Sequence, residues 1–218
     1  MRKGFRVFVP LMLSALVVGC SQDIGKAAST AKGRVGGTIV LSSAADADLL
    51  LPPLTMTLQG KQVVDQIFDN LADIGPGLNT VADAGFTPRL SDRWSWAPDS
   101  MSVSFHLNPR ARWHDGSAVR AEDVRYTFAL VKDTAFASPL ASDLDNVDSV
   151  SVVDSLTARV WFHQRTPDAF FKAANPIAIL PSHLLKTLSP ASMRESQFAR
   201  SPVGSGRFRF AAWDRGER

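Results

Sequence analysis

The chain has 218 residues, of which 45% are hydrophobic and 21% are charged, and its formal net charge is +3. Arg2, Lys3 and Arg6 account for that charge, because the first 19 residues hold these three basic residues and no acidic one. The rest of the chain is neutral overall, which gives no support for nucleic-acid binding, since that function needs a concentrated basic face.

The first 19 residues have the pattern of an export signal. A basic start is followed by an apolar run over 7–18 that is too short to span a membrane, and the run closes on Leu16-Val-Val-Gly-Cys20. Small residues before a cysteine resemble the lipobox of bacterial lipoproteins, although a secretory signal followed by a chance cysteine would look alike. We expect cleavage before Cys20, acylation of Cys20, and a lipid-anchored protein outside the cytoplasm.

Cys20 is the only cysteine of the chain, so an internal disulfide and a cysteine-based zinc site are excluded. Residues 20–35 are small and polar and are predicted to be a flexible tether. About 180 residues then remain, enough for one good core or two small ones.

Apolar periodicity predicts a mixture of helices and strands after the tether. Alternating or continuous apolar runs indicate strands, and apolar residues three and four apart indicate helices. The expected elements, in chain order, are a buried strand over 37–42, a helix over 59–71, a turn at 75–77, a strand over 102–107, a helix over 121–131, a hairpin over 147–162, a short helix over 167–174 and a strand from 207. This pattern indicates an α/β or α+β fold.

His114 and Asp115 look at first like catalytic residues. Neighbouring side chains point in different directions, so the two cannot face each other as a triad requires, and no G-x-S-x-G motif supplies a nucleophile. Asp115-Gly116 is a typical turn dipeptide. We therefore predict a structural role here and no catalytic residues.

No cofactor or metal site is predicted. The four histidines, 106, 114, 163 and 183, do not have metal-ligand spacing. Gly204-Ser-Gly206 lacks the rest of a phosphate loop and precedes a predicted strand, so it is interpreted as a turn. Four aromatic residues are assigned to the core rather than to a ligand surface: Trp94, Trp96, Trp113 and Tyr126.

Five segments in order resemble family 5 of the bacterial extracellular solute-binding proteins, which serve ABC importers of oligopeptides, dipeptides and nickel. They are Gly36-Gly-Thr-Ile-Val40, Ile67-Phe-Asp-Asn-Leu71, the long stretch over 88–124 with Trp113-His-Asp-Gly116 and Ala121-Glu-Asp-Val124, Ile179-Leu-Pro-Ser-His183, and 201–217. Within this family, Trp113 is expected to pack, Asp115-Gly116 to turn the chain, and Glu122 and Asp123 to lie in a first helical turn. One departure is Arg120, where the family usually has a capping Thr or Ser.

The resemblance implies a fold of the periplasmic-binding-protein type II class. Lobe I is expected over 36–70 and 156–218, with an inserted subdomain over 71–155. Family members are more than twice as long, so the sequence is expected to hold the first lobe without the second. We therefore expect this chain alone to bind a solute weakly or not at all.

The resemblance also implies binding rather than catalysis. An extended segment, Thr55-Met56-Thr57-Leu58, is expected to pair with peptide backbone like an added strand, and Leu140 to approach the same cleft. The expected partners are a peptide or other small solute, ABC permease subunits and a membrane reached through the lipid. The alternatives are a lipoprotein hydrolase built on His114 or His183, and a structural lipoprotein that docks on a partner.

Overall fold

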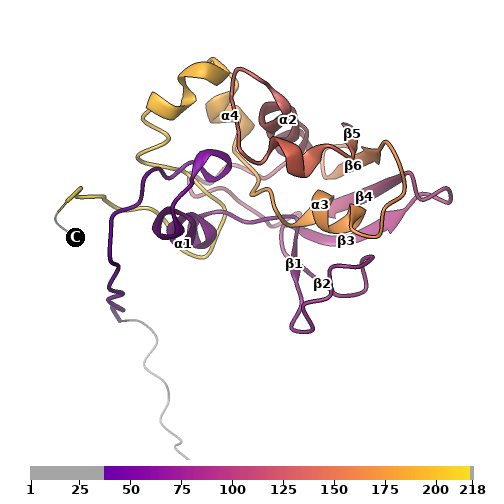
Figure 1. Ribbon diagram of the computed structural model, residues 1–218, viewed down its shortest axis with the longest axis horizontal. Helices are drawn as coiled ribbons and strands as arrows, with labels where there is room; N and C mark the ends of the chain where they lie inside the picture. Colours follow the sequence, from indigo (N-terminus) through magenta and orange to yellow (C-terminus); the bar gives the residue numbers. More distant parts are fainter. Residues whose placement is uncertain (1–36, 217–218) are drawn as a thin grey trace, which may run out of the picture. The chain divides into compact units, whose positions relative to one another are not determined.

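A four-stranded antiparallel sheet forms the centre of the computed structural model, which describes residues 37–216 (Figure 1). Its strand order is β3 (Ser91–Trp96), β4 (Ser102–Leu107), β6 (Thr157–Phe162) and β5 (Val147–Asp154). A second sheet pairs β1 (Ala72–Ile74) with β2 (Phe86–Pro88). The helices are α1 (Leu58–Ile67), α2 (Ala121–Lys132), α3 (Ala169–Ala174) and α4 (Ser182–Leu185), with short 3-10 turns η1 (Pro52–Leu54), η2 (Ala141–Leu144) and η3 (Pro190–Glu195).

Side-chain alternation places one face of this sheet in the core, as predicted. On β4 the side chains of Val103, Phe105 and Leu107 are buried, while Ser104 and His106 point to the other, more exposed face. The β5–β6 hairpin predicted over 147–162 is also confirmed. Because successive side chains of a strand point to opposite faces, the apolar period of two is enough to choose the buried face.

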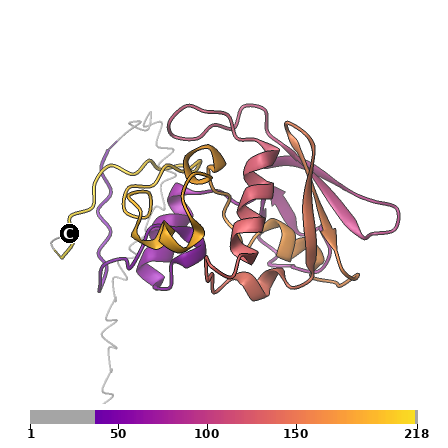
Figure 2. The same ribbon diagram turned by 90° about the horizontal axis from the view of Figure 1, so that it is seen from above.

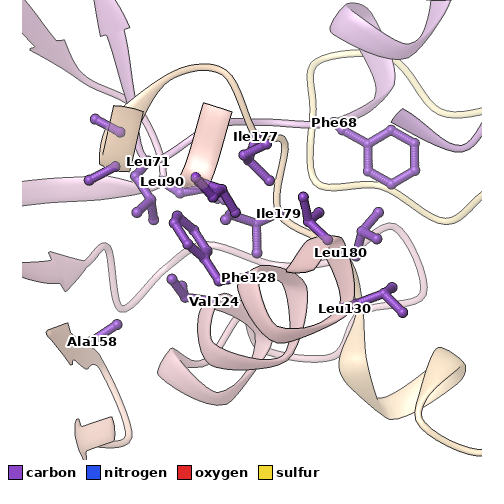
Figure 3. Packing of buried hydrophobic residues seen from close by; sticks show 14 of the residues in the cluster. Phe68, Leu71, Leu90, Val124, Phe128, Leu130, Ala158, Ile177, Ile179 and Leu180 are labelled. Atoms are coloured by element: carbon purple, nitrogen blue, oxygen red, sulfur yellow. The ribbon is translucent and has the colours of Figure 1, made fainter. Parts of the chain in front are cut away.

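Helix α2 covers the buried face of the sheet, as Figure 2 shows from above. Val124 and Phe128 project from α2 toward Ile179 and Leu90 in the close-up of the core (Figure 3). None of the helices formed by residues 37–216 is both long and apolar enough to cross a bilayer.

The aromatic residues belong to the core, as predicted. Phe170 of α3 lies at ring-centroid distances of 5.0 Å from Trp94 and 6.2 Å from Trp96. Trp113 is fully buried, and Tyr126 packs against the core, where burial raises the pKa of its phenol to about 12. Strand β3 was not predicted from the sequence, and two tryptophans that alternate with polar residues hold it against the core.

Helix α1 ends four residues earlier than predicted, at Ile67. The backbone N–H groups of Gly206 and Phe208 donate to the carbonyls of Ile67 and Gln66, at 2.7 and 3.1 Å. These carbonyls lie at the end of the helix, where no intrahelical partner is left for them. Phe68 and Leu71 nevertheless stay buried, so their apolar signal was correct and only the helical assignment was wrong.

Two predicted strands do not form. Ile39, Val40 and Leu41, which belong to a separate unit from residues 42–218, are 84–87% exposed and have no strand conformation. The segment from Arg207 to Phe210 is also irregular. A strand needs a neighbour for its backbone groups, and within residues 37–216 neither segment has a pairing partner.

Arg120 occupies the N-cap of α2, and its side chain accepts no hydrogen bond there. Its own N–H donates to Asp123 Oδ2 at 2.8 Å, so one half of a capping box is present. We expect Arg120→Ser to stabilise the protein by about 1 kcal/mol, because a serine hydroxyl can accept from a first-turn amide. Urea unfolding measures this gain, with Arg120→Ala as the matched control; an equal gain in both variants would contradict the capping account.

Candidate ligand-binding site

A cavity of about 700 Å³ lies within the unit formed by residues 42–218. This volume is in the range that small-molecule sites usually have. Its wall comes from η1 and α1, from the chain that follows α1 into β1, from η2, and from the segment after α3. Two residues predicted from the resemblance, Thr55 and Leu140, line it.

An ion network built on Arg89 forms one wall of this cavity. Arg89 Nε lies 2.6 Å from Asp69 Oδ1, and Arg89 Nη1 lies 3.3 Å from Asp73 Oδ2. Asp69 and Arg89 are mostly buried, and burial raises the pKa of Asp69 although the guanidinium of Arg89 favours its ionised form. Both aspartates therefore have a cationic partner already, and this wall is fixed before a ligand arrives.

The segment over 55–58 is only partly free. Thr55 and Thr57 are extended, but Leu58 is the first residue of α1, so the extended run is shorter than predicted. The N–H of Thr55 donates to the carbonyls of Leu51 and Pro52, and the N–H of Met56 donates to Asp48 Oδ2 at 2.8 Å. Thr57 caps α1 by accepting from the Gly60 N–H.

Asp48 holds this segment in place. Partial burial raises the pKa of Asp48, but hydrogen bonds from Met56 and Thr57 outweigh it and leave the pKa below its ordinary value. Met56 and Leu58 are both 67% exposed and do not line the cavity. Of the four residues, only Thr55 therefore faces the cavity directly, and ligand contact by the segment stays a prediction.

Leu140 reaches the cavity because its loop is fixed to η1. The hydroxyl of Ser138, a buried side chain, donates to the Pro53 carbonyl at 2.6 Å and accepts from the Leu140 N–H at 3.2 Å. These bonds join residues 85 positions apart in the sequence. These bonds bring Thr55 and Leu140 to one cavity. From the sequence, this proximity was predicted only through the family resemblance.

Asp115, Ser117 and His183 meet on the surface, yet they do not form a catalytic triad. His183 Nε2 lies 2.7 Å from Asp115 Oδ2 and 3.0 Å from Ser117 Oγ. A triad needs the carboxylate and the hydroxyl on different ring nitrogens. A carboxylate only accepts, so Nε2 carries a proton here and cannot take one from Ser117. The hydrolase alternative therefore gains no support.

The Asp115 cluster predicts a pH dependence of stability. Partial burial raises the pKa of Asp115, but hydrogen bonds from Ser117 and His183 outweigh it and hold the pKa at about 2. The stabilisation is complete above the ordinary pKa of 3.8 and is lost as the pH falls through about 2. We expect the stability difference between wild type and Asp115→Asn in urea to shrink from pH 5 to pH 2.5.

Asp145→Asn is the control for this comparison, since Asp145 is exposed and its carboxylate has no partner in the described part of the chain. A difference between wild type and Asp115→Asn that stays constant with pH would contradict the prediction.

The remaining parts of the Trp113–Gly116 motif are structural, as predicted. His114 Nδ1 accepts from the Gly204 N–H at 3.3 Å, and its Nε2 donates to the Gly206 carbonyl at 2.9 Å. Gly116 has φ +93 and turns the chain. Glu122 and Asp123 lie in the first turn of α2. His114 thus fastens the Gly204–Gly206 loop, which is irregular and bends at Ser205 and Gly206.

Two further features of the cavity were not recognised as site residues from the sequence. Asp69 and Arg89 lie in segments that carry the family resemblance, and Asp143 of η2 was not singled out. Nothing in local sequence marks them, because they meet only in the fold. No group of three potential ligands that could hold a metal ion occurs within residues 37–216. Cys20 lies outside those residues.

Comparison with known proteins identifies the family to which the chain belongs. The profile of the bacterial extracellular solute-binding proteins, family 5 (middle part), matches residues 85–218. The oligopeptide-binding protein AppA of Bacillus subtilis is 21% identical over 208 residues, which are 95% of this chain and 37% of AppA. An ABC transporter peptide-binding protein of Brucella ovis is 26% identical over 122 residues, 56% of this chain and 23% of its own length.

A solved structure of AppA from Bacillus subtilis, in complex with a nonapeptide, matches with a TM-score of 0.73 at 20% identity. The match covers 80% of this chain and 34% of that chain. The chain thus spans about a third of the length of this relative. The predicted fold class, part of a lobe of the periplasmic-binding-protein type, is confirmed by this likeness.

Proposed function

The chain belongs to the bacterial extracellular solute-binding proteins of family 5, and from this premise we propose that it acts in the substrate-binding component of a peptide-type ABC importer. In this role it captures peptides or related solutes outside the cytoplasm and passes them to permease subunits. It performs no catalysis itself, as expected for a transport component.

One observation carries this proposal. Thr55 of the extended segment and Leu140 both line the cavity, which supports their proposed contact with a ligand. The carbonyl of Thr55, the one residue of this segment that lines the cavity, has no hydrogen-bond partner among residues 37–216. Such backbone groups can bind peptide backbone without reading its side chains. In the proposed domain organisation, 36–70 and 156–218 form lobe I and 71–155 form the inserted subdomain, so the cavity lies where they meet.

A titration followed by two-dimensional ¹H–¹⁵N NMR tests peptide capture by the chain. Short peptides added to millimolar concentration are expected to shift the amide signals of Thr55, Thr57 and Leu140. The signals of Ser104 and Arg159 serve as the control, since they lie on the far face of the sheet. Of the two outcomes expected from the sequence, weak binding or none, the proposal commits this chain to weak binding. Shifts confined to that face, or no shifts at all, would therefore contradict it.

We further propose that Cys20 carries lipid and anchors the protein to a membrane outside the cytoplasm. The expectation is a native, membrane-extracted protein whose mass begins at Cys20 and includes acyl chains. Cys20→Ala should abolish both the added lipid mass and the membrane association. Mass spectrometry of the two proteins decides this, and an unlipidated native protein would contradict it. The same native mass measures how long the protein is in the cell.

A further inference from the structure

Asp143 is the one aspartate of the cavity wall whose carboxylate has no hydrogen-bond or ion-pair partner within residues 37–216. The other three are Asp65, paired with Lys61 at 2.9 Å, and Asp69 and Asp73, both paired with Arg89. Asp143 is half-buried, so its carboxylate has lost part of its hydration. A partly desolvated anion without a partner is costly, and a cationic group would relieve that cost.

The balance of charges in the cavity wall also favours a cationic ligand group. Four aspartates line it against three basic residues, Lys61, Arg89 and Arg207. Lys61 and Arg89 are already paired, and Arg207 is exposed, where water and salt screen its charge. The enclosed part of the cavity therefore favours a positive group.

Asp143 is held in a fixed position relative to the extended segment. It belongs to η2, and its N–H donates to the Leu140 carbonyl at 3.1 Å. Leu140 is tied through Ser138 to Pro53, two residues before Thr55. Hydrogen bonds that run from Asp143 through Leu140 and Ser138 to Pro53 therefore link the unpaired carboxylate to the segment that contains Thr55.

We propose that Asp143 reads a cationic group of the ligand, so that the cavity selects solutes bearing an amine or a guanidinium. This inference rests on the proposed function, because it assigns the specificity of the same cavity. The cation is either the free α-amine of a peptide or a basic side chain, since both offer the charged N–H donors that a carboxylate binds best.

Three tripeptide probes separate these sources: trialanine amide, whose only charge is its α-amine; N-acetyl-trialanine amide, which has no charge; and N-acetyl-Ala-Lys-Ala amide, whose only charge is the lysine. NMR titrations of the purified full chain give the Kd of each. We expect at least one of the charged probes to bind roughly tenfold to a hundredfold more tightly than the uncharged one. Asp143→Asn should remove this preference.

Asp145→Asn is the matched control, because Asp145 carries the same charge two residues away but does not line the cavity. It is expected to keep the preference. Equal binding of charged and uncharged probes to the wild type would overturn the inference and leave peptide capture intact. Loss of the preference in both variants would also overturn it, since a diffuse field would then be the cause. Failure of all three probes to bind would overturn the proposed function together with it.

Discussion

Replacing Gly204 by alanine is expected to lower the free energy of unfolding by about 3 kcal/mol, which is a large part of the stability of an ordinary domain. A Cβ at Gly204 would overlap the carbonyl oxygen of Ile67 and lie 2.7 Å from its carbonyl carbon. That oxygen cannot move aside easily, because it accepts the Gly206 N–H at 2.7 Å. On the opposite side, His114 clamps the loop through the Gly204 N–H and the Gly206 carbonyl.

Urea unfolding followed by circular dichroism measures this effect. Gly77→Ala is the matched control, since a Cβ there meets nothing within 4 Å, and it should change stability by no more than about 0.5 kcal/mol. An unfolding midpoint of Gly204→Ala equal to that of wild type would show that the loop can move away from α1. The close approach of Gly204 to the Ile67 carbonyl would then not be required for folding.

Asp123→Asn is the second change with a large expected effect, a loss of about 3 kcal/mol. Asp123 is buried, and its carboxylate accepts four hydrogen bonds. Oδ2 accepts from Trp113 Nε1 at 3.2 Å and from the Arg120 N–H at 2.8 Å, and Oδ1 accepts from the N–H and the hydroxyl of Ser182 at 2.9 and 2.6 Å. An asparagine replaces one acceptor by a donor, so two buried donors lose their partner at about 1–3 kcal/mol each.

The neighbouring Glu122→Gln provides the control, because Glu122 is exposed and, among residues 37–216, pairs only with Arg125. It should change the free energy of unfolding by less than about 1 kcal/mol. The indole N–H signal of Trp113 gives an independent measurement, since it should shift in Asp123→Asn and stay in place in Glu122→Gln. A stable Asp123→Asn protein with an unmoved indole signal would contradict the role given to Asp123.

Local sequence rules predicted the elements that carry a clear period. Strands β4 and β6 and helix α2 were found because their apolar side chains recur every two residues or every three to four. Strand β5 was found with β6 as a hairpin around Asp154-Ser155. Strand β3 was missed because its apolar positions are two tryptophans among polar residues. The strands expected at 37–42 and from 207 have the right composition, but composition does not supply a hydrogen-bonded neighbour.

The candidate site was predictable only in part. The resemblance led to Thr55 and Leu140, and the fold brings both to one cavity. It gave no reason to choose Asp143 or the Arg89 network, because those side chains are brought together by contacts between distant segments. Likewise, the carboxylate of Asp115 contacts His183, which lies 68 positions away in the sequence, and not its sequence neighbour His114.

The sequence by itself therefore determined the family, the structural role of the Trp113–Gly116 motif, and most regular elements, because these depend on local spacing and on motif order. Tertiary structure alone decided where α1 ends, that Gly204 has no room for a side chain, and which cavity carboxylate lacks a partner. Those properties arise when backbone groups and charges from remote segments compete for the same partners, and no local pattern records that competition.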